Sequence, residues 1–250
     1  MKKITRRGFI KSALALGVLP LGLSAGEKTV HETLREQEVE EGLRLIHITD
    51  SHMDLANEES IDALMHKSEY GTLALCSANK PYSLPINFVK VGDALYFHGA
   101  KKGRKIDILK ENSFASFSIV EAHAMIQSYF SSDEGLACPA TQFFKSIIID
   151  GVVEFVEEYE EKVSALSALM QKLQPEGKYK TLSDAAYTKA INATSVYKLI
   201  PKETRAKFKF GQHLTQERFE MILSHLKNRA EEMDIQTIDM MQKSRRDNAL

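Results

Sequence analysis

The stretch YFHGAKKGRKIDIL, residues 96–109, carries four cationic side chains within five positions: Lys101, Lys102, Arg104 and Lys105. They surround Gly103, follow a predicted strand and precede a predicted short helix. Glycine lets a backbone approach an anion closely, arginine offers a fork that matches phosphate oxygens, and lysine adds point charge. Because the formal net charge of the chain is only −1, the loop is a focused candidate phosphate site. A solvated basic loop is the equal alternative.

A second possible chemistry lies in LRLIHITDSHMDL, residues 43–55. Asp50 and His52 follow an apolar run that could form a buried strand, so both side chains can reach one metal ion. The string IHITDSHMDL resembles the first metal-binding block of calcineurin-like metallophosphoesterases. A two-metal site needs further ligands, and the later Gly-Asn-His-Glu and Gly-His-x-His blocks do not occur in the sequence. We therefore expect no metal site and no phosphoesterase activity; the block is either a fused remnant or an accidental likeness.

The N-terminal residues 1–25 have the features of an export signal. Arg6 and Arg7 precede the apolar stretch SALALGVLPLGLSA, which is too short for a comfortable membrane span and ends in small residues. The segment resembles a twin-arginine signal, which implies export of the folded protein to the periplasm by the twin-arginine machinery. An uncleaved anchor or a chance helix is the alternative.

The composition is that of a soluble globular protein, with 250 residues of which 43% are hydrophobic and 27% charged. The near-neutral charge gives no general field for nucleic acid, so no nucleic-acid partner is expected. Cys76 and Cys138 have no zinc-site spacing. Cys76 lies in an apolar strand pattern and is predicted to be a buried free thiol, with a disulfide as the alternative.

The hydrophobic pattern predicts a mainly β protein with helices, of the α+β class. A charged linker at residues 26–58 leads to an amphipathic helix at 58–65, and strands are expected at 43–48, 71–78, 82–90, 94–98, 114–120, 146–155 and 194–200. Pro85 indicates an edge strand, and Asp150-Gly151 a bulge. Further helices are expected at 157–174 and after Thr215, a candidate cap. Residues 230–250 are predicted to be a polar, mobile tail.

The connections between these strands are too short for parallel crossovers, so the pattern favours a small antiparallel β-barrel with added helices. Residues 81–112 resemble the core of the pyridoxamine 5′-phosphate oxidase-like flavin-binding split barrels, most of all the nitroimidazole-resistance branch. The residues that match are Pro81, Tyr82, Pro85, Asn87, Phe88, Tyr96, Phe97, His98, Ala100, Gly103, Arg104 and Lys105.

Two later segments add to this resemblance. Residues 137–170 resemble the next segment of the branch through Cys138, Ser146 and Gly151, although Phe144 replaces the usual Tyr. The string FKFGQHLT, residues 208–215, is similar to a segment near the C-terminus of related flavin-binding proteins. The resemblance implies a split β-barrel over residues 59–229 that forms a homodimer with FMN at the subunit interface.

The resemblance also assigns roles to residues. Arg104 and Lys105 match the positions that hold the FMN phosphate, and His98 and Gly99 match a strand end beside the phosphate and ribityl chain. A hydrogen-bonded strand-end role for His98 is the equal alternative. Thr72, Leu73 and Ala74 match the strand that lines the isoalloxazine ring. Lys145 and Ser146 match the strand that reaches the flavin from the other subunit. Lys102 is added on charge alone, as is Lys101.

We therefore expect an exported FMN-binding protein, and a flavin-dependent oxidoreductase of a small-molecule substrate. The protein would supply binding and polarity around the flavin, which carries the electron chemistry. No residue is a convincing proton donor for the pyridoxamine oxidase reaction, so no catalytic residue is predicted. A haem-binding or haem-degrading protein of the same fold, and a non-enzymatic flavin-binding protein, are the alternatives.

Overall fold

The structure is a computed structural model, and it describes residues 45–48 and 57–247. The signal-like segment, the charged linker up to residue 44, and the Asp50 and His52 pair lie outside the described residues. The strand expected at residues 43–48 is confirmed as β1 (Leu45–Ile48). Among the described residues no helix is both long and apolar enough to cross a membrane.

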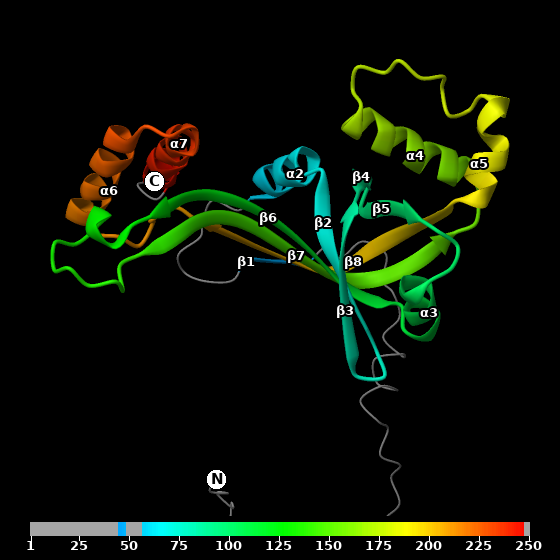
Figure 1. The fold of residues 1–250 in the computed structure, drawn as a ribbon, viewed down its shortest axis with the longest axis horizontal. Helices are drawn as coiled ribbons and strands as arrows, with labels where there is room; N and C mark the ends of the chain where they lie inside the picture. The colour runs from blue at the N-terminus through cyan, green and yellow to red at the C-terminus, as the bar shows by residue number, and fades with distance from the viewer. Residues whose placement is uncertain (1–44, 49–56, 248–250) are drawn as a thin grey trace, which may run out of the picture. The chain divides into compact units, whose positions relative to one another are not determined.

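One sheet organises the described chain (Figure 1). Its strands after β1 are β2 (Tyr70–Ser77), β3 (Lys80–Asn87), β4 (Val89–Val91), β5 (Ala94–Gly99), β6 (Phe114–Ile126), β7 (Thr141–Val156) and β8 (Ser195–Lys209). They are hydrogen-bonded in the antiparallel order β3-β2-β6-β7-β8-β5-β4 and curl into a half-barrel. The expected α+β split barrel is confirmed. A departure from the antiparallel pattern is β1, which pairs with β8 in parallel.

The three longest strands extend beyond the predicted segments. β6, β7 and β8 have 13, 16 and 15 residues, whereas the pattern predicted seven to ten residues for each. The extensions contain charged residues that blurred the alternation of polar and apolar positions. Glu121 of β6 and Lys145 of β7 are cross-strand neighbours whose Oε2 and Nζ atoms lie 3.7 Å apart, so the charges are compensated inside the sheet.

The turns and irregularities follow from particular residues. Ala78 and Asn79 form the two-residue β2–β3 turn with φ of 46° and 58°, a left-handed conformation that asparagine tolerates well. β3 lies at one edge of the sheet, which confirms the prediction from Pro85. The register between β7 and β8 shifts after Asp150, which confirms the bulge. A Cβ on Gly151 would lie 2.2 Å from the Ile200 carbonyl oxygen, so only glycine fits there.

The helices cover parts of the sheet and its ends. They are α2 (Glu58–Lys67), α3 (Arg104–Glu111), α4 (Tyr159–Leu173), α5 (Thr188–Ala193), α6 (Gln216–Arg229) and α7 (Glu232–Asp247), with the 3-10 turns η1 (Ser128–Phe130) and η2 (Ala185–Tyr187). The Thr215 side chain caps α6, as expected. Ile61, Leu64 and Met65 of α2 are buried, which confirms the amphipathic face.

The expectation of a mobile tail after Arg229 is wrong, because α7 packs against β6 and α6. Met241 is fully buried, and so is Asp234, whose carboxylate accepts a hydrogen bond from Arg229 Nε at 2.8 Å. Thr237 Oγ1 accepts a hydrogen bond from the Ala124 amide at 3.0 Å. The helix was missed because satisfied polar contacts, rather than an apolar stripe, hold much of its inner face.

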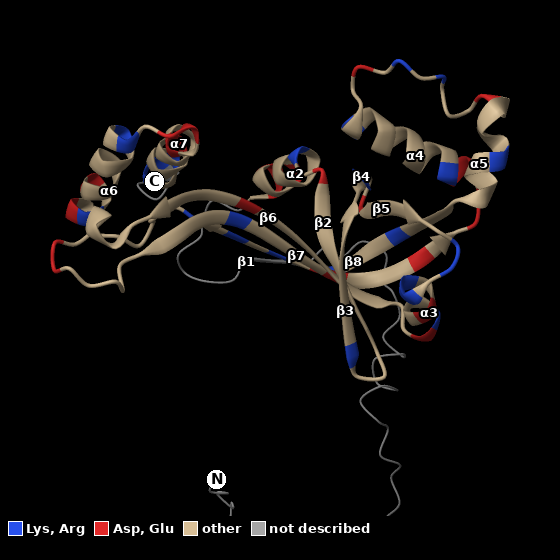
Figure 2. Ribbon diagram, viewed as in Figure 1, with Lys and Arg blue, Asp and Glu red and all other residues tan. Residues whose placement is uncertain are grey.

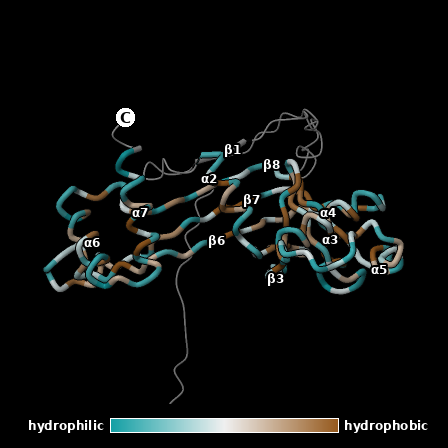
Figure 3. The backbone as a smooth tube through the Cα atoms, turned by 90° about the horizontal axis from the view of Figure 1, so that it is seen from above, coloured by the Kyte–Doolittle hydropathy of each residue, from teal (hydrophilic) through white to brown (hydrophobic). Residues whose placement is uncertain are grey.

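The core lies on one face of the sheet and under the helices. Its largest fully buried side chains include Phe97, Phe117, Phe208 and Tyr197, and hydrophobic and hydrophilic residues alternate along the strands (Figure 3). Both cysteines are free and exposed, so the prediction of a buried Cys76 is wrong. Leu75, its neighbour in β2, faces the core, and consecutive strand residues point to opposite faces.

Candidate anion-binding site

The predicted basic loop joins β5 to α3. β5 ends at Gly99 and α3 begins at Arg104, and blue segments mark the lysines and arginines of this connection in Figure 2. Gly103 is the N-terminal cap residue of α3 and has φ of 121°, which disfavours any residue with a side chain. Its carbonyl accepts the first helical hydrogen bond, from the Ile106 amide at 2.8 Å. The backbone amides at the start of α3 thus face the end of the cationic loop.

Lys105 is held over an aromatic floor. Its Nζ lies 4.6 Å from the centroid of the Tyr197 ring and 5.9 Å from that of Phe97. Burial lowers the pKa of Lys105, because a charged ammonium loses solvation there. No carboxylate in residues 57–247 forms an ion pair with it. A bound anion would therefore supply the missing negative charge.

Gly99 makes room for this lysine. A Cβ at residue 99 would lie 2.6 Å from Lys105 Nζ, well inside contact distance. Any side chain at this position would therefore push the ammonium group away from the end of β5. Gly99 and Lys105, which were predicted in separate roles, thus form a structural unit in which the absence of one side chain leaves room for the other.

Arg104 lies beside the same loop and is exposed. Its guanidinium carbon is 4.5 Å from the centroid of the Tyr82 ring, and Nη2 donates to the Pro81 carbonyl at 3.4 Å. The described residues give Arg104 no carboxylate partner either. Stacking on Tyr82 orients the guanidinium plane and leaves most of its donors available to a ligand. Lys102 and Lys101 are exposed loop residues without a fixed contact of this kind.

His98 is the exposed residue next to Gly99 in β5. Its pKa is lowered, first because the surrounding chain limits solvation of the charged ring and second because Lys105 places a positive charge nearby. The imidazole is therefore neutral at neutral pH. The structure thus brings His98, Gly99 and Lys105 together. Arg104 precedes Lys105 at the start of α3, and its guanidinium lies over Tyr82 of β3.

Thr72, Leu73 and Ala74, the residues predicted to line the isoalloxazine ring, lie in β2. Leu73 is fully buried in the core, so only its backbone is available to a ligand on the other face. Thr72 and Ala74 point to that other face, opposite Pro85 and Ser83 of β3. β3 also contains Pro81, whose carbonyl accepts the hydrogen bond from Arg104. The β2–β3 hairpin therefore connects the predicted ring-binding strand to the cationic loop.

Lys145 and Ser146 are not joined to this loop within the chain. They are consecutive residues of β7, so their side chains point to opposite faces of the sheet. Lys145 faces Glu121 and lies with its Nζ 5.7 Å from the centroid of the Phe208 ring. Ser146 Oγ donates to the Lys207 carbonyl at 3.4 Å. Hence at most one of the two can face a ligand held against one side of the sheet.

Two aromatic residues of the site were not predicted as binding residues. Tyr82 belonged to the family-like segment and could have been proposed, because a tyrosine ring can hold a cation over its face. Tyr197 lies about a hundred residues away in β8 and pairs with Phe97 of β5. The sequence carries no local signal for that contact, since it depends on the strand order.

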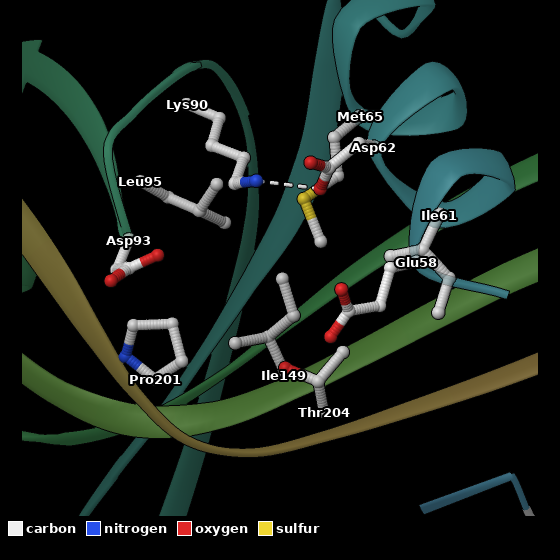
Figure 4. Close-up of a pocket in the computed structure, with 10 residues that line it drawn as sticks. All are labelled: Glu58, Ile61, Asp62, Met65, Lys90, Asp93, Leu95, Ile149, Pro201 and Thr204. Carbon is white, nitrogen blue, oxygen red and sulfur yellow. Dashed lines mark hydrogen bonds and ion pairs between the residues drawn. The ribbon is translucent and has the colours of Figure 1, made fainter. Parts of the chain in front are cut away.

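A separate small hollow lies between α2 and the sheet (Figure 4). It measures about 20 Å³, and its lining includes Glu58, Asp62, Lys90 and Asp93. Lys90 Nζ donates to Asp62 Oδ1 at 2.5 Å, so its positive charge is already compensated. The space is sufficient for a water molecule but not for an organic ligand.

Comparison with protein families gives a match to the family described as pyridoxamine 5′-phosphate oxidase, over residues 57–208. Comparison with curated proteins gives no match.

Several solved structures share the fold. A candidate 5-nitroimidazole antibiotic resistance protein from Bacteroides thetaiotaomicron VPI-5482 is 21% identical, with a TM-score of 0.50, over 61% of this chain and 84% of that one. The flavocytochrome Anf3 from Azotobacter vinelandii is 22% identical, with a TM-score of 0.53, over 61% and 67% of the two chains. The FAD and haem binding protein from Mycobacterium smegmatis is 24% identical, with a TM-score of 0.50, over 61% and 71%.

Proposed function

The chain belongs to the pyridoxamine 5′-phosphate oxidase family of flavin-binding split barrels, and from this we propose that it binds FMN at the loop between β5 and α3. The observation that carries the proposal is the group formed by Gly99, Arg104 and Lys105. It offers two cations without a carboxylate partner among the described residues, beside the first turn of a helix. Phosphate at a helix N-terminus gains from both the backbone amides and the helix dipole.

The chemistry of the donors fits a phosphate monoester. Arg104 can donate from a plane that Tyr82 already orients, and Lys105 supplies a point charge over Tyr197. The absent side chain at Gly99 lets a ribityl chain run close to the end of β5. Thr72 and Ala74 then offer a strand surface for the isoalloxazine ring on the outer face of β2.

We further propose that the protein is a homodimer that uses this outer face. Val120 of β6 and Ile148 of β7 point away from the core and are 64% and 38% exposed, an arrangement that favours contact with a second apolar surface. Ser146 lies on the same face as Ile148. Ser146, rather than Lys145, is thus the better placed of the two to approach the flavin of the partner.

The reaction that this site supports best is electron transfer to or from a small-molecule substrate. FMN supplies the electron chemistry when bound, and this chain supplies binding, orientation and polarity. The residues Arg104 and Lys105 anchor the phosphate. His98, neutral at neutral pH, can hydrogen-bond beside the ribityl chain without adding a further positive charge.

A haem-binding function is the second candidate, and one observation favours it. His98 is exposed next to the cationic loop, and its lowered pKa keeps the imidazole in the neutral form that ligates iron. A flavin-binding protein without enzymatic activity is the third. The absorption spectrum of the purified protein separates the first two, since flavin and haem have distinct visible absorption bands.

The direct test is a titration of the purified dimer with FMN and with riboflavin, followed by the flavin fluorescence. We expect tight binding of FMN, weaker binding of riboflavin, and a flavin spectrum in the protein as isolated. Reduction of the bound flavin by a nicotinamide donor, with reoxidation by an acceptor, would separate an oxidoreductase from a binding protein. Equal affinity for FMN and riboflavin would rule out a phosphate site at the loop.

We also propose export by the twin-arginine route, on the strength of Arg6 and Arg7 and the apolar stretch after them. Export of a folded protein suits a cofactor that is inserted before transport. Replacing both arginines by lysine should keep the protein in the cytoplasm with its signal attached. Unchanged periplasmic localisation of that variant would contradict the proposal.

A further inference from the structure

A larger cavity, of about 220 Å³, lies between the ends of β7 and β8 and the start of α6. The lining residues that matter here are Ser131, Thr141, Phe143, Lys209, Leu214 and Arg218. Within one chain this cavity is far from the basic loop. Gly99 pairs with Ser195 at one end of β8, whereas Lys209 is at the other end of that 15-residue strand. At 3.2–3.4 Å per residue the two ends lie on the order of 45 Å apart along the strand.

Lys209 is a positive charge without compensation in this cavity. Its Nζ donates to Thr141 Oγ1 at 2.5 Å. Burial and the neighbouring Lys207 both lower the pKa of Lys209, as expected where a cation lacks a counter-ion. None of the ion pairs found within residues 57–247 involves Lys209. The hydroxyl of Thr141 orients the ammonium group but does not neutralise it.

Arg218 is a second such cation, and it is fixed from one side. Its Nε donates to the Ser131 carbonyl at 3.1 Å and its Nη2 to Ser131 Oγ at 3.3 Å. Ser131 itself is buried, with 3% of its surface exposed. One edge of the guanidinium plane is therefore anchored, and the donors of Nη1 remain for a ligand. Arg218, too, has no carboxylate partner in the described part of the chain.

The cavity is also lined by His213 and, on one side, by apolar side chains. Phe143 and Ile222 are each 1% exposed, and Leu214 is half-buried beside them. A site for a fully hydrated inorganic anion has no need of such a surface, whereas an organic anion buries its body against it. The small hollow in Figure 4 differs from this cavity in two ways. Its volume is only about 20 Å³, and its lysine, Lys90, already forms an ion pair with Asp62.

We propose that the larger cavity binds a small organic carboxylate. Its carboxylate group lies between Lys209 and Arg218, and its apolar body packs on Phe143 and Leu214. A carboxylate matches the two cations because its two oxygens can accept from both at once. The volume suits a ligand of metabolite size rather than a drug-sized one. This site is independent of the flavin proposal and requires no flavin.

The probe for the first experiment is benzoate, with benzamide as its uncharged counterpart, titrated calorimetrically into the full-length protein. We expect benzoate to bind and benzamide to bind at least tenfold more weakly, which corresponds to about 1.4 kcal/mol. Lys209→Met and Arg218→Met should each weaken benzoate binding at least tenfold. The matched control is Lys227→Met, which removes an exposed cation from the same helix as Arg218. Thermal unfolding of each variant checks that it is folded.

A second measurement needs no variant. Cys138 lines the cavity, and Cys76 lies on β2 away from it; both are free and exposed. Benzoate should slow the alkylation of Cys138 by iodoacetamide, while Cys76 reacts at an unchanged rate, as followed by peptide mass spectrometry. The thiolate displaces iodide in both reactions, so Cys76 reports any direct effect of benzoate on the reagent.

Three results would overturn the proposal. One is equal binding of benzoate and benzamide, and another is undiminished benzoate binding in both cavity variants together with unprotected Cys138. The third is displacement of benzoate by FMN, which would make the cavity part of a flavin site. Failure of FMN to bind at all would contradict the proposed function and leave the benzoate result unaffected.

Discussion

The ammonium group of Lys105 lies 4.6 Å from the centroid of the Tyr197 ring, and the hydroxyl of Tyr197 donates to the Ala100 carbonyl at 3.0 Å. One buried aromatic residue thus supports both the cation and the loop that leads to it. Tyr197 is fully buried and stacks on Phe97 with the ring centroids 5.4 Å apart. The geometry of the cationic loop is therefore set by the core of β5 and β8 rather than by the loop itself.

The double variant Arg104→Ala/Lys105→Ala should purify folded but lose FMN. A hydrogen bond to a charged group contributes about 1.5–3 kcal/mol, so the loss of both cations should cost about two to four powers of ten in affinity. Riboflavin, which has no phosphate, should lose much less. Lys110→Ala, an exposed residue of the same helix, is the control. FMN affinity near that of the unmodified protein would mean that the phosphate lies elsewhere.

Gly99→Ala should weaken FMN binding without a change in fold. The new Cβ would lie 2.6 Å from Lys105 Nζ, so the flexible lysine must move away from its place over Tyr197. We expect a loss of about tenfold, since a displaced charge-assisted hydrogen bond is weakened rather than removed. In a Lys105→Ala background the same substitution should have little further effect. Additive losses in the double variant would show that the two residues act separately.

Val120→Glu should shift the protein from dimer to monomer and lower its flavin content. Val120 is 64% exposed on the outer face of β6, where a buried carboxylate at a subunit interface would be strongly unfavourable. Ile235→Glu is the matched control, because Ile235 is 66% exposed but lies on α7. Light scattering at micromolar concentration measures the change. A dimer that persists in the Val120 variant, or one lost in both variants, would contradict the proposed interface.

The sequence alone was sufficient for most of the fold because hairpin turns and alternation are local signals. Pro85 marks an edge strand and Asp150-Gly151 a bulge, and both of these predictions are confirmed. The tail at α7 was missed because its contacts with Ala124 and Arg229 join residues that are distant in the chain or polar. A helix held by such contacts lacks the regular spacing of apolar residues from which helices are predicted.

The candidate site, like the fold, contains some residues that local sequence signals identify and others that depend on long-range contacts. Arg104 and Lys105 were predictable from charge density around a glycine. Their aromatic supports, and the cavity between Lys209 and Arg218, depend on which strands become neighbours. Lys145 and Ser146 were predicted as a pair, but a strand separates consecutive residues onto opposite faces. A motif match identifies positions, whereas the pleat decides which of them can act together.

Lys172 of α4 connects that helix to α2 and to the junction between β3 and β4, and it makes stability depend on pH. Its Nζ donates to the carbonyls of Met65 and Phe88, at 2.9 Å each, and lies 3.8 Å from the centroid of the Phe88 ring. Lys172→Met keeps the aliphatic stem but removes both donors. Since each lost hydrogen bond contributes about 0.5–1.5 kcal/mol, the free energy of unfolding should fall by about 1–3 kcal/mol at pH 9.5, where Lys172 is neutral in the folded protein, and by less at pH 7, where the cost of the buried charge offsets the two bonds. Lys189→Met, at an exposed position of α5, is the control.

The pH dependence of this difference gives a sharper test. Burial lowers the pKa of Lys172 to about 8 in the folded protein, whereas the pKa of a lysine in an unfolded chain is about 10.4. Between these values the unfolded state binds more protons, so the contribution of Lys172 to stability rises with pH from about 8 to about 10. The free energy of unfolding, measured with urea, should therefore differ more between the unmodified protein and Lys172→Met at pH 9.5 than at pH 7.5. The first pH lies inside the window of about 8–10.4 and the second lies just below it. A gap that narrows with rising pH would mean that the folded protein favours the charged form, and that the carbonyls of Met65 and Phe88 outweigh the loss of solvation.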